Sequence, residues 1–265
     1  MRLKGKTVLV TASTRGIGLA IVRKCAKEGA AVYMAARNME RAQAEAAKLS
    51  ADGFQIKCVY NDATKPETFP TMVEDVIKDA GRIDVLVNNF GTSNPGKDLD
   101  FSHTDADVFL ETVNLNLRSV FMASQAAAKY MAAQGGGSII NISSVGGLVP
   151  DISQVAYGTS KAAINYLTKL IAVQEARSHI RCNAVLPGMT ATDAVEKNLT
   201  EEFRNLFLRH IPLKRMGLPE EIAAAVIYFA SDESAYTTGQ ILTVSGGFGL
   251  ATPVYGDLSD RTNRR

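Results

Sequence analysis

A tyrosine and a lysine stand four residues apart in the segment Tyr157-Gly158-Thr159-Ser160-Lys161. If this segment is helical, both side chains lie on one face of the helix. A neighbouring ammonium favours the phenolate and lowers the pKa of a tyrosine, which is ordinarily about 10. Such a phenol can exchange a proton with an alcohol while the carbon gives up a hydride. The pair alone could equally be an ordinary surface pair, so this interpretation needs support from other residues.

Polar residues follow two of the predicted strands that precede this pair. Ser144 follows a predicted strand over 138–142, and Asn89 follows one over 85–87. Ligands of open α/β sheets bind at the carboxyl ends of the strands. Ser144 is therefore a candidate partner of Tyr157, although a serine here could also cap a loop and the asparagine could belong to a plain turn.

The first predicted strand, 7–10, leads into a turn with two glycines and then into a helix. Gly16 and Gly18 permit a tight turn and a close approach of the backbone to a ligand. The N-terminus of the helix offers unpaired N–H groups and a partial positive charge, which suit a pyrophosphate. The position after the first strand favours a dinucleotide site over an ordinary turn. The candidate cofactor residues of this turn are Ser13, Thr14, Arg15, Gly16, Ile17 and Gly18.

The end of the second predicted strand favours NADP over NAD. Ala36 stands where an acidic residue would bind the ribose 2′-hydroxyl, and Arg37 follows it. No carboxylate is present there to repel a 2′-phosphate, and Arg15 and Arg37 could both pair with one. Each arginine alone could be a solvated surface residue, but together with the missing acid they predict NADP.

Short apolar runs alternate with longer amphipathic stretches along the chain. This alternation predicts one α/β domain over 1–265, with a doubly wound parallel sheet of about seven strands and helices on both faces. The predicted strands cover 7–10, 31–35, 55–60, 85–87, 138–142, 180–186 and 241–244. The predicted helices cover 17–29, 39–49, 66–79, 105–133, 153–176, 200–209 and 219–230.

The composition excludes several classes of protein. The 265 residues carry 29 basic and 27 acidic side chains, a net charge of +2 without a concentrated basic face, so no nucleic-acid partner is predicted. No apolar run is long enough for a secretion signal or a membrane span. The three cysteines form no Cys-x-x-Cys pair and the three histidines lie far apart, so neither a disulfide framework nor a metal site is expected. We therefore expect a cytoplasmic enzyme.

Ordered motifs along almost the whole chain resemble the short-chain dehydrogenase/reductase family. They are the TASTRGIG turn, Asp62 after the third predicted strand, NNFG, Asn116, Ser144, YGTSK and Pro187-Gly188. The resemblance implies a Rossmann fold and a catalytic tetrad formed by Asn116, Ser144, Tyr157 and Lys161. It also implies that the two long helices pair across a two-fold axis in a homotetramer, although their apolar runs could equally be buried within one subunit.

The resemblance implies a role for each residue of the tetrad. Tyr157 would be the acid/base, and Lys161 would hold the nicotinamide ribose and assist Tyr157. Ser144 would orient the substrate oxygen, and Asn116 would support a water relay to Lys161. The further cofactor residues that it implies are Asp62 and Ala63 at the adenine, Asn89 and Gly91 beside the cofactor, and Thr190 and Thr192 at the carboxamide.

Two residues depart from the pattern of the family. Ala12 replaces the usual first glycine of the phosphate turn, so the backbone there must keep a negative φ or tolerate mild strain. Phe90 replaces the usual alanine of NNAG, and we expect it to narrow the floor of the pocket.

A narrower resemblance is to the NADP-dependent 7α-hydroxysteroid dehydrogenases of clostridia. It is carried by MRLKGKTVLVTASTRGIGLA, VLVNNFG, GGGSIINISSVGGLVPDIS, IRCNAVLPGMTATDA and GGFGLATP. The implied reaction is the reversible oxidation of a bile-acid 7α-hydroxyl to the ketone, with hydride passing to NADP⁺. Two alternatives stay open. A reductase of another ketone, such as a 3-oxoacyl-[acyl-carrier-protein], would share every catalytic residue, whereas a non-catalytic NADP-binding regulator would have no reason to keep the tetrad together.

The segment 189–215 follows the sixth predicted strand and is a candidate lid over the substrate. Its apolar stripe, which would suit a flat steroid face or simply pack on its own core, consists of Leu199, Phe203, Leu206 and Phe207. The candidates for meeting an anionic tail of the substrate, each of which could also be merely solvated, are Arg209, His210 and Lys214. Residues 248–265 extend past the usual end of the family, and the polar tail 259–265 is predicted to fray.

Overall fold

The computed structural model describes residues 1–198, 200–252 and 254–262. Its strands are β1 (Thr7–Thr11), β2 (Ala31–Ala36), β3 (Ile56–Tyr60), β4 (Val85–Asn88), β5 (Gly137–Ile142), β6 (Ile180–Pro187) and β7 (Ile241–Val244). Its helices are α1 (Gly16–Lys27), α2 (Met39–Ala51), α3 (Thr68–Ala80), α4 (Ala106–Ala133), α5 (Val155–Gln174), α6 (Asp193–Asn198), α7 (Glu201–Leu208), α8 (Pro219–Ala230) and α9 (Tyr255–Thr262). Every predicted strand and helix forms, with its ends shifted by at most two residues.

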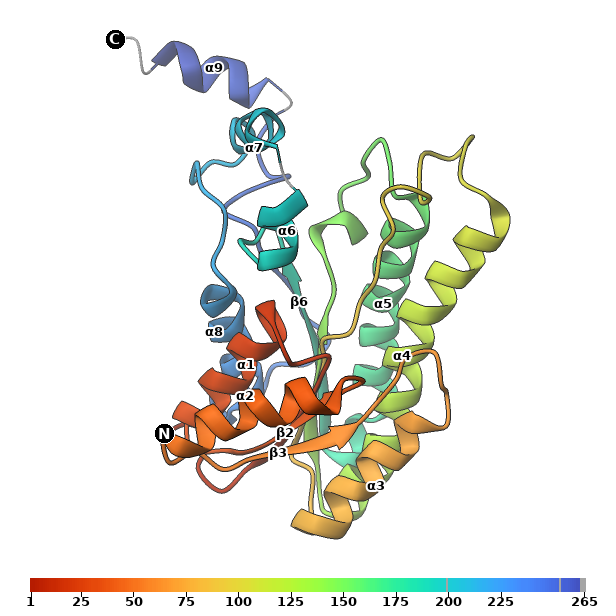
Figure 1. The fold of residues 1–265 in the computed structure, drawn as a ribbon, viewed down its shortest axis with the longest axis vertical. Helices are drawn as coiled ribbons and strands as arrows, with labels where there is room; N and C mark the ends of the chain where they lie inside the picture. The colour runs from red at the N-terminus through yellow and green to blue at the C-terminus, as the bar shows by residue number, and fades with distance from the viewer. Residues whose placement is uncertain (199, 253, 263–265) are drawn as a thin grey trace.

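These strands make one parallel sheet in the order β3-β2-β1-β4-β5-β6-β7. Helices α1, α2 and α8 cover one face, and α3, α4 and α5 cover the other (Figure 1). The strand order reverses between β1 and β4, and in such sheets the crevice at the carboxyl ends of these two strands receives the ligand. The predicted doubly wound, Rossmann-type fold is confirmed.

Alternation along each strand builds the two hydrophobic layers. In β1, Val8 and Val10 point into the core beneath α1 and α8, whereas Leu9 between them points into the core beneath α3 and α4. All three side chains are fully buried. Because both faces of the sheet are covered, the strand must be apolar at every position, which is why it appears in the sequence as a continuous apolar run.

Two helices were not foreseen, and both stand beyond the carboxyl edge of the sheet with α7 (Figure 1). Helix α6 lies within the predicted lid segment. Helix α9 includes residues 259–262, so the prediction that the tail frays from 259 onward is wrong for these residues; 263–265 lie outside the described residues. Contacts with the segment before α8 hold α9 in place, since Arg209 pairs with Asp257 at 2.7 Å and Lys214 lies over the ring of Tyr255.

No helix in the described ranges is both long and apolar enough to cross a membrane.

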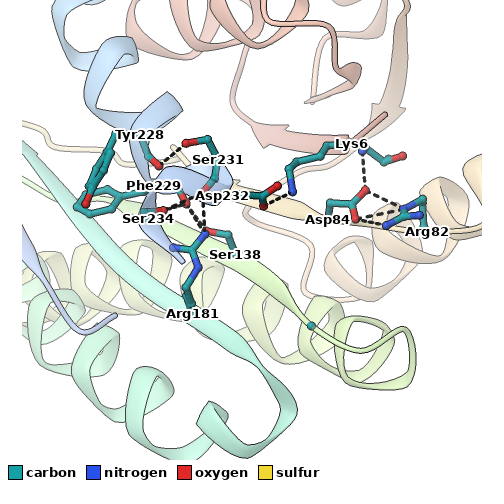
Figure 2. Close-up of polar contacts among 12 residues, drawn as sticks. Lys6, Arg82, Asp84, Ser138, Arg181, Tyr228, Phe229, Ser231, Asp232 and Ser234 are labelled. Carbon is teal, nitrogen blue, oxygen red and sulfur yellow. Dashed lines mark hydrogen bonds and ion pairs between the residues drawn. The ribbon is translucent and has the colours of Figure 1, made fainter. Parts of the chain in front are cut away.

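At the opposite edge of the sheet, the amino edge where the strands begin, a polar cluster joins α8 to β5 and β6 (Figure 2). The carbonyl of Phe229, near the end of α8, accepts from Ser138 Oγ at 2.8 Å, Ser234 Oγ at 3.0 Å and Arg181 Nη2 at 2.8 Å. Arg181 also donates to the carbonyl of Thr237 at 3.3 Å. Burial lowers the pKa of the Arg181 guanidinium, and the negative charge of Asp232 partly offsets this shift. The cluster therefore fixes the end of α8 against β5 and β6, far from the carboxyl edge.

We expect Arg181→Met to lower the free energy of unfolding by about 1.5–3 kcal/mol, because buried carbonyls lose a charged donor. Urea denaturation measures this loss. The exposed Arg177→Met is the control and should change stability by less than about 0.5 kcal/mol. Equal losses in the two variants would contradict a role for the cluster in stability.

Candidate active site

The turn after β1 adopts a strained conformation that a second strand supports. Ala12 has φ = 50°, a left-handed conformation that is mildly unfavourable for alanine, so strain is the outcome of replacing glycine here. Asn89, which follows β4, donates from its side-chain amide to the carbonyls of Thr11 at 3.1 Å and Ala12 at 3.0 Å. The backbone N–H of Asn89 donates to Thr11 Oγ1. The carboxyl ends of β1 and β4 are thereby locked together.

The two glycines of the turn meet different constraints. A Cβ on Gly18 would lie 2.5 Å from Nδ2 of Asn89 and 2.6 Å from the carbonyl oxygen of Ala12, so no side chain fits. Gly16 has φ = 51°, and a Cβ there would lie 3.3 Å from the methyl group of Thr192. Thr192 thus faces the turn from the segment after β6.

The N-terminus of α1 suits an anionic group. Its N-cap residue, Arg15, is extended, and no side chain caps the first turn. The first turn also lacks an acidic residue, so its N–H groups and the positive end of the helix dipole keep their capacity for an anion. In the same turn Ser13 Oγ is buried without a hydrogen-bond partner among the described residues. These features fit the pyrophosphate of a dinucleotide.

The predicted adenine end brings Asp62 and Arg37 near each other. Burial alone would raise the pKa of Asp62, but hydrogen bonds from Thr64 and the charges of Arg37 and Lys65 bring it below its usual value. The Asp62 carboxylate accepts from the N–H and the hydroxyl of Thr64. Ala63, a predicted adenine contact, is buried, and its carbonyl accepts from an arginine of α4 at 3.2 Å. The positive charge of Arg37 after β2 therefore acts on the carboxylate of Asp62 after β3 without forming an ion pair with it.

The structure brings Ser144, Tyr157 and Lys161 together at the carboxyl end of β5. The Ser144 hydroxyl lies within hydrogen-bonding reach of the Tyr157 phenol. Lys161 is buried, and its Nζ donates to the carbonyl of Ile142 at 3.0 Å. The same Nζ lies 5.5 Å from the centre of the Tyr157 ring. Because Tyr157 and Lys161 are one helical turn apart in α5, the predicted shared face is confirmed.

Burial controls the protonation of this group. It raises the pKa of Tyr157, and the hydrogen bond with Ser144 lowers that pKa by a smaller amount. The prediction of a lowered pKa for Tyr157 is therefore wrong, because burial of the phenolate is the largest effect and Ser144, rather than Lys161, supplies the smaller opposing one. Burial also lowers the pKa of Lys161, to about 8. Of these two side chains, Lys161 is thus the one whose pKa lies closer to neutral pH.

Asn116 lies in the middle of α4 but does not face solvent. Its carboxamide accepts from the backbone N–H of Thr92 at 2.8 Å and donates to the Thr92 carbonyl at 2.9 Å. It also donates to Ser160 Oγ in α5 at 3.0 Å. Asn116 therefore joins α4, α5 and the loop after β4 just beneath Tyr157 and Lys161.

Two glycines lie next to the side chains of the proposed tetrad, and the sequence assigned only the first of them. A Cβ on Gly91 would lie 2.9 Å from Lys161 Nζ, so this expected cofactor residue gives the lysine its room. A Cβ on Gly146 would lie 3.6 Å from Ser144 Oγ and 3.9 Å from the ring of Tyr157, which are ordinary contact distances, so Gly146 directly adjoins both side chains. Spacing in the sequence gave no signal for Gly146.

Phe90 and Thr190, two further residues that the sequence analysis singled out, both make contacts within the fold. Phe90 is partly buried and packs against the core beneath α3 and α4. That it narrows the floor of the pocket stays a prediction. Thr190 is buried, and its hydroxyl donates to the Gly188 carbonyl at 3.0 Å, which shapes the turn after β6.

Known proteins are similar to this chain in sequence and in architecture. The model of a family described as enoyl-(acyl carrier protein) reductase matches residues 11–249. A 7α-hydroxysteroid dehydrogenase of Clostridium sardiniense is 51% identical over 260 residues, covering 98% of this chain and 99% of the relative. A 3-oxoacyl-[acyl-carrier-protein] reductase of Thermotoga maritima is 38% identical, with 93% and 99% covered.

Solved structures agree with these matches. A 7α-hydroxysteroid dehydrogenase complexed with NADH and 7-oxo glycochenodeoxycholic acid has a TM-score of 0.88 and 33% identity, with 93% of this chain and 95% of that one covered. A gluconate 5-dehydrogenase of Burkholderia cenocepacia, in complex with NADP and tartrate, has a TM-score of 0.89 and 32% identity, with 95% and 98% covered. With this fold, this site and these relatives, the chain belongs to the short-chain dehydrogenase/reductase family.

Proposed function

We propose that the protein is an NADP-dependent oxidoreductase that reversibly oxidises the 7α-hydroxyl of bile acids, such as cholate and chenodeoxycholate, to the 7-oxo product. The observation that carries the chemistry is the meeting of Ser144, Tyr157 and Lys161 at the edge where the phosphate turn also ends. The steroid substrate is supported by the 51% identity to a 7α-hydroxysteroid dehydrogenase over almost the full length of both chains.

The residues of the tetrad divide the work on the proton. Ser144 orients the substrate oxygen toward Tyr157, whose phenol takes the hydroxyl proton during oxidation and returns it during reduction. Because burial raises the pKa of Tyr157, its neutral form prevails near pH 7 and suits donation to the ketone. Lys161, with its pKa near 8, can release and regain a proton behind Tyr157. Asn116, held by Thr92 and Ser160, would support the relay to that lysine.

The cofactor would lie along the carboxyl edge of the sheet. Its nicotinamide supplies the acceptor for the hydride that leaves the 7-carbon. The first turn of α1 would hold the pyrophosphate, and Lys161 the nicotinamide ribose. The remaining contacts would come from Asn89 and Gly91 beside the cofactor, Thr190 and Thr192 at the carboxamide, and Asp62 and Ala63 at the adenine.

Preference for the phosphorylated cofactor rests on two exposed arginines. Arg15 and Arg37 make no ion pair with any carboxylate of the described residues within 4.0 Å, and the end of β2 carries Ala36 in place of an acid. Both guanidiniums are thus available to a 2′-phosphate, which they can bind through paired charged hydrogen bonds.

The segment 189–215 would act as a lid with an apolar inner face. In α7, Phe203 and Leu206 are about half exposed, although aromatic and aliphatic side chains usually lie buried. The ring of Phe207 stacks on Phe203 at 6.2 Å and on Phe248 at 4.8 Å between centroids. Leu199, the remaining member of the predicted stripe, lies outside the described residues. A rigid apolar ring system would cover these exposed side chains.

The residues 248–262 would steady that lid. Phe248 extends the aromatic stack, and Arg209 and Lys214 bind Asp257 and Ser259 of α9 at 2.7 and 2.9 Å. These two cations are therefore engaged in holding α9 against the lid. The third candidate for an anionic tail of the substrate, His210, is exposed and lies against α9, where a Cβ on Gly256 would be 3.0 Å from its ring.

We also propose that α4 and α5 pair with those of a second copy in a homotetramer. Their outer faces expose large apolar side chains, including Phe121 at 48%, Tyr166 at 66% and Val173 at 78%. An apolar groove runs between the two helices there, lined among others by Leu117, Phe121, Tyr166 and Leu170. Such a continuous apolar face is typical of a buried contact between subunits. A location in the cytoplasm stays a prediction.

We expect the purified protein with NADP⁺ to oxidise cholate, seen as a rise in absorbance of the reduced cofactor. The 7β-epimer and NAD⁺ should each support a rate at least about tenfold lower, because one misplaced oxygen or one lost phosphate contact costs more than about 1.4 kcal/mol. An acetoacetyl thioester serves as the competing substrate. Its reduction with NADPH, without turnover of cholate or its 7-oxo product, would contradict the steroid assignment in favour of the acyl-carrier-protein reductase.

Tyr157→Phe removes the exchangeable proton and keeps the ring. We expect turnover to fall by about 10² or more while the Kd for NADP⁺, measured by fluorescence titration, stays within twofold. The fully exposed Tyr236→Phe is the matched control and should retain wild-type turnover. Near-normal turnover of Tyr157→Phe would exclude the phenol as the proton carrier.

Arg37→Ala should raise the KM for NADP⁺ by about 10- to 100-fold, the equivalent of one charged hydrogen-bonded contact, and leave the KM for NAD⁺ nearly unchanged. Steady-state kinetics with the two cofactors measure this split. Arg41→Ala, which replaces an exposed arginine in the first turn of α2, should change neither value. A parallel rise for both cofactors would show that Arg37 does not recognise the 2′-phosphate.

A further inference from the structure

The first turn of α5, which carries Tyr157, lacks a cap of its own. Its N-cap residue Gln154 has φ = 60° and ψ = 47°, a left-handed conformation that is uncommon for a residue with a side chain. The side chain of Gln154 does not cap the helix, because its Oε1 accepts instead from Ser93 Oγ at 2.6 Å. The first turn holds no acidic residue either. The N–H groups that lead toward Tyr157 therefore need an acceptor from elsewhere in the chain.

Asp98 supplies that acceptor from the loop after β4. One carboxylate oxygen accepts from the backbone N–H of Ala156 and the other from that of Tyr157, both at 2.9 Å. Asp98 is fully buried, and no cation of the described residues lies within ion-pairing distance of it. A buried carboxylate is costly in free energy unless its oxygens are hydrogen-bonded. The two N–H groups of α5 therefore stabilise Asp98 in its buried position.

The rest of the loop 92–99 is tied to the same turn and to the tetrad. The Leu99 carbonyl accepts from the Val155 N–H at 3.2 Å, and the Asp98 N–H donates to the Asn94 carbonyl at 2.8 Å. At the other end of the loop, Thr92 exchanges two hydrogen bonds with Asn116. The loop thus links one proposed tetrad residue on α4 to another on α5.

We propose that Asp98 is a positioning residue for Tyr157, which caps the first turn of α5 from the loop after β4 and so holds the phenol beside Ser144. This inference rests on the proposed role of Tyr157 in the reaction. The carboxylate suits the position for two reasons. It accepts two N–H groups at once, and its negative charge lies at the positive end of the helix dipole. An amide in its place would lose one acceptor and turn a donor toward a donor.

The test compares Asp98→Asn with Asp100→Asn. Asp100 is the matched control because its carboxylate contacts stay within its own turn, at Ser102 and His103. We expect Asp98→Asn to lower kcat for cholate by about 10- to 100-fold, as a small displacement of a reacting group does, with the Kd for NADP⁺ within twofold. Asp100→Asn should leave both values within twofold of the wild type.

A double-mutant cycle separates positioning from general loosening of the fold. If Asp98 acts through Tyr157, Asp98→Asn should lower the residual rate of the Tyr157→Phe variant by less than about twofold. A full 10- to 100-fold loss in that background would overturn the proposal, and so would a kcat of Asp98→Asn within twofold of the wild type.

If Asp98→Asn does not fold, Ser93→Ala takes its place, with an expected loss of kcat of about fivefold for one neutral hydrogen bond. An unchanged kcat there would overturn the proposal as well.

Hydrogen–deuterium exchange provides a readout that does not depend on the substrate. The peptide that contains Ala156 and Tyr157 should exchange faster in Asp98→Asn than in the wild type or in Asp100→Asn, all with NADP⁺ bound. Unchanged exchange would overturn the cap. If the wild type turned over neither cholate nor an acetoacetyl thioester, the proposed function would have failed, and this exchange comparison would still decide whether Asp98 holds the first turn of α5.

Discussion

The burial of Lys161 beside Tyr157 is the constraint on which the rest of the site depends. An ammonium that is removed from water must be compensated by hydrogen bonds, and here Nζ donates to the Ile142 carbonyl at the end of β5. A Cβ on Gly91, which follows β4, would lie 2.9 Å from Nζ, so a larger residue there would clash with the lysine. The pKa of the lysine falls to about 8 as a consequence of burial. One buried side chain thus fixes the relative placement of β4, β5 and α5.

The two edges of the sheet are used for different purposes. At the amino edge, Arg181 and its serine partners gather on the Phe229 carbonyl and secure α8. At the carboxyl edge, polar groups instead hold strained or mutually close backbone, as Asn89 does at the positive φ of Ala12. Because the amino edge and the apolar layers supply the stability, the carboxyl edge can tolerate strain, buried charge and exposed apolar side chains. Such unfavourable features commonly gather at functional sites.

The proposed tetrad is assembled mainly through loops and backbone groups. Asn116 reaches the site through Thr92, and Tyr157 is fixed through the loop 92–99. These contacts span residues far apart in the chain, so each depends on the sheet having brought β4 beside β5. Variation in the proposed lid and in the residues after β7 can then alter the substrate without disturbing this assembly, which is why one fold serves many reactions.

The sequence alone determined the order and type of the strands and helices, the phosphate turn and the shared face of Tyr157 and Lys161. These depend on local periodicity and on residues that are near one another in the chain, so they are legible without coordinates. Only the tertiary structure decided the direction of the Tyr157 pKa shift, the packing of Phe90 against the core, the helix α9 and the hydrogen bonds of Asp98. Each of these depends on desolvation or on a contact between distant segments. A loop aspartate such as Asp98 looks like any solvated residue until the fold places two unpaired N–H groups against it.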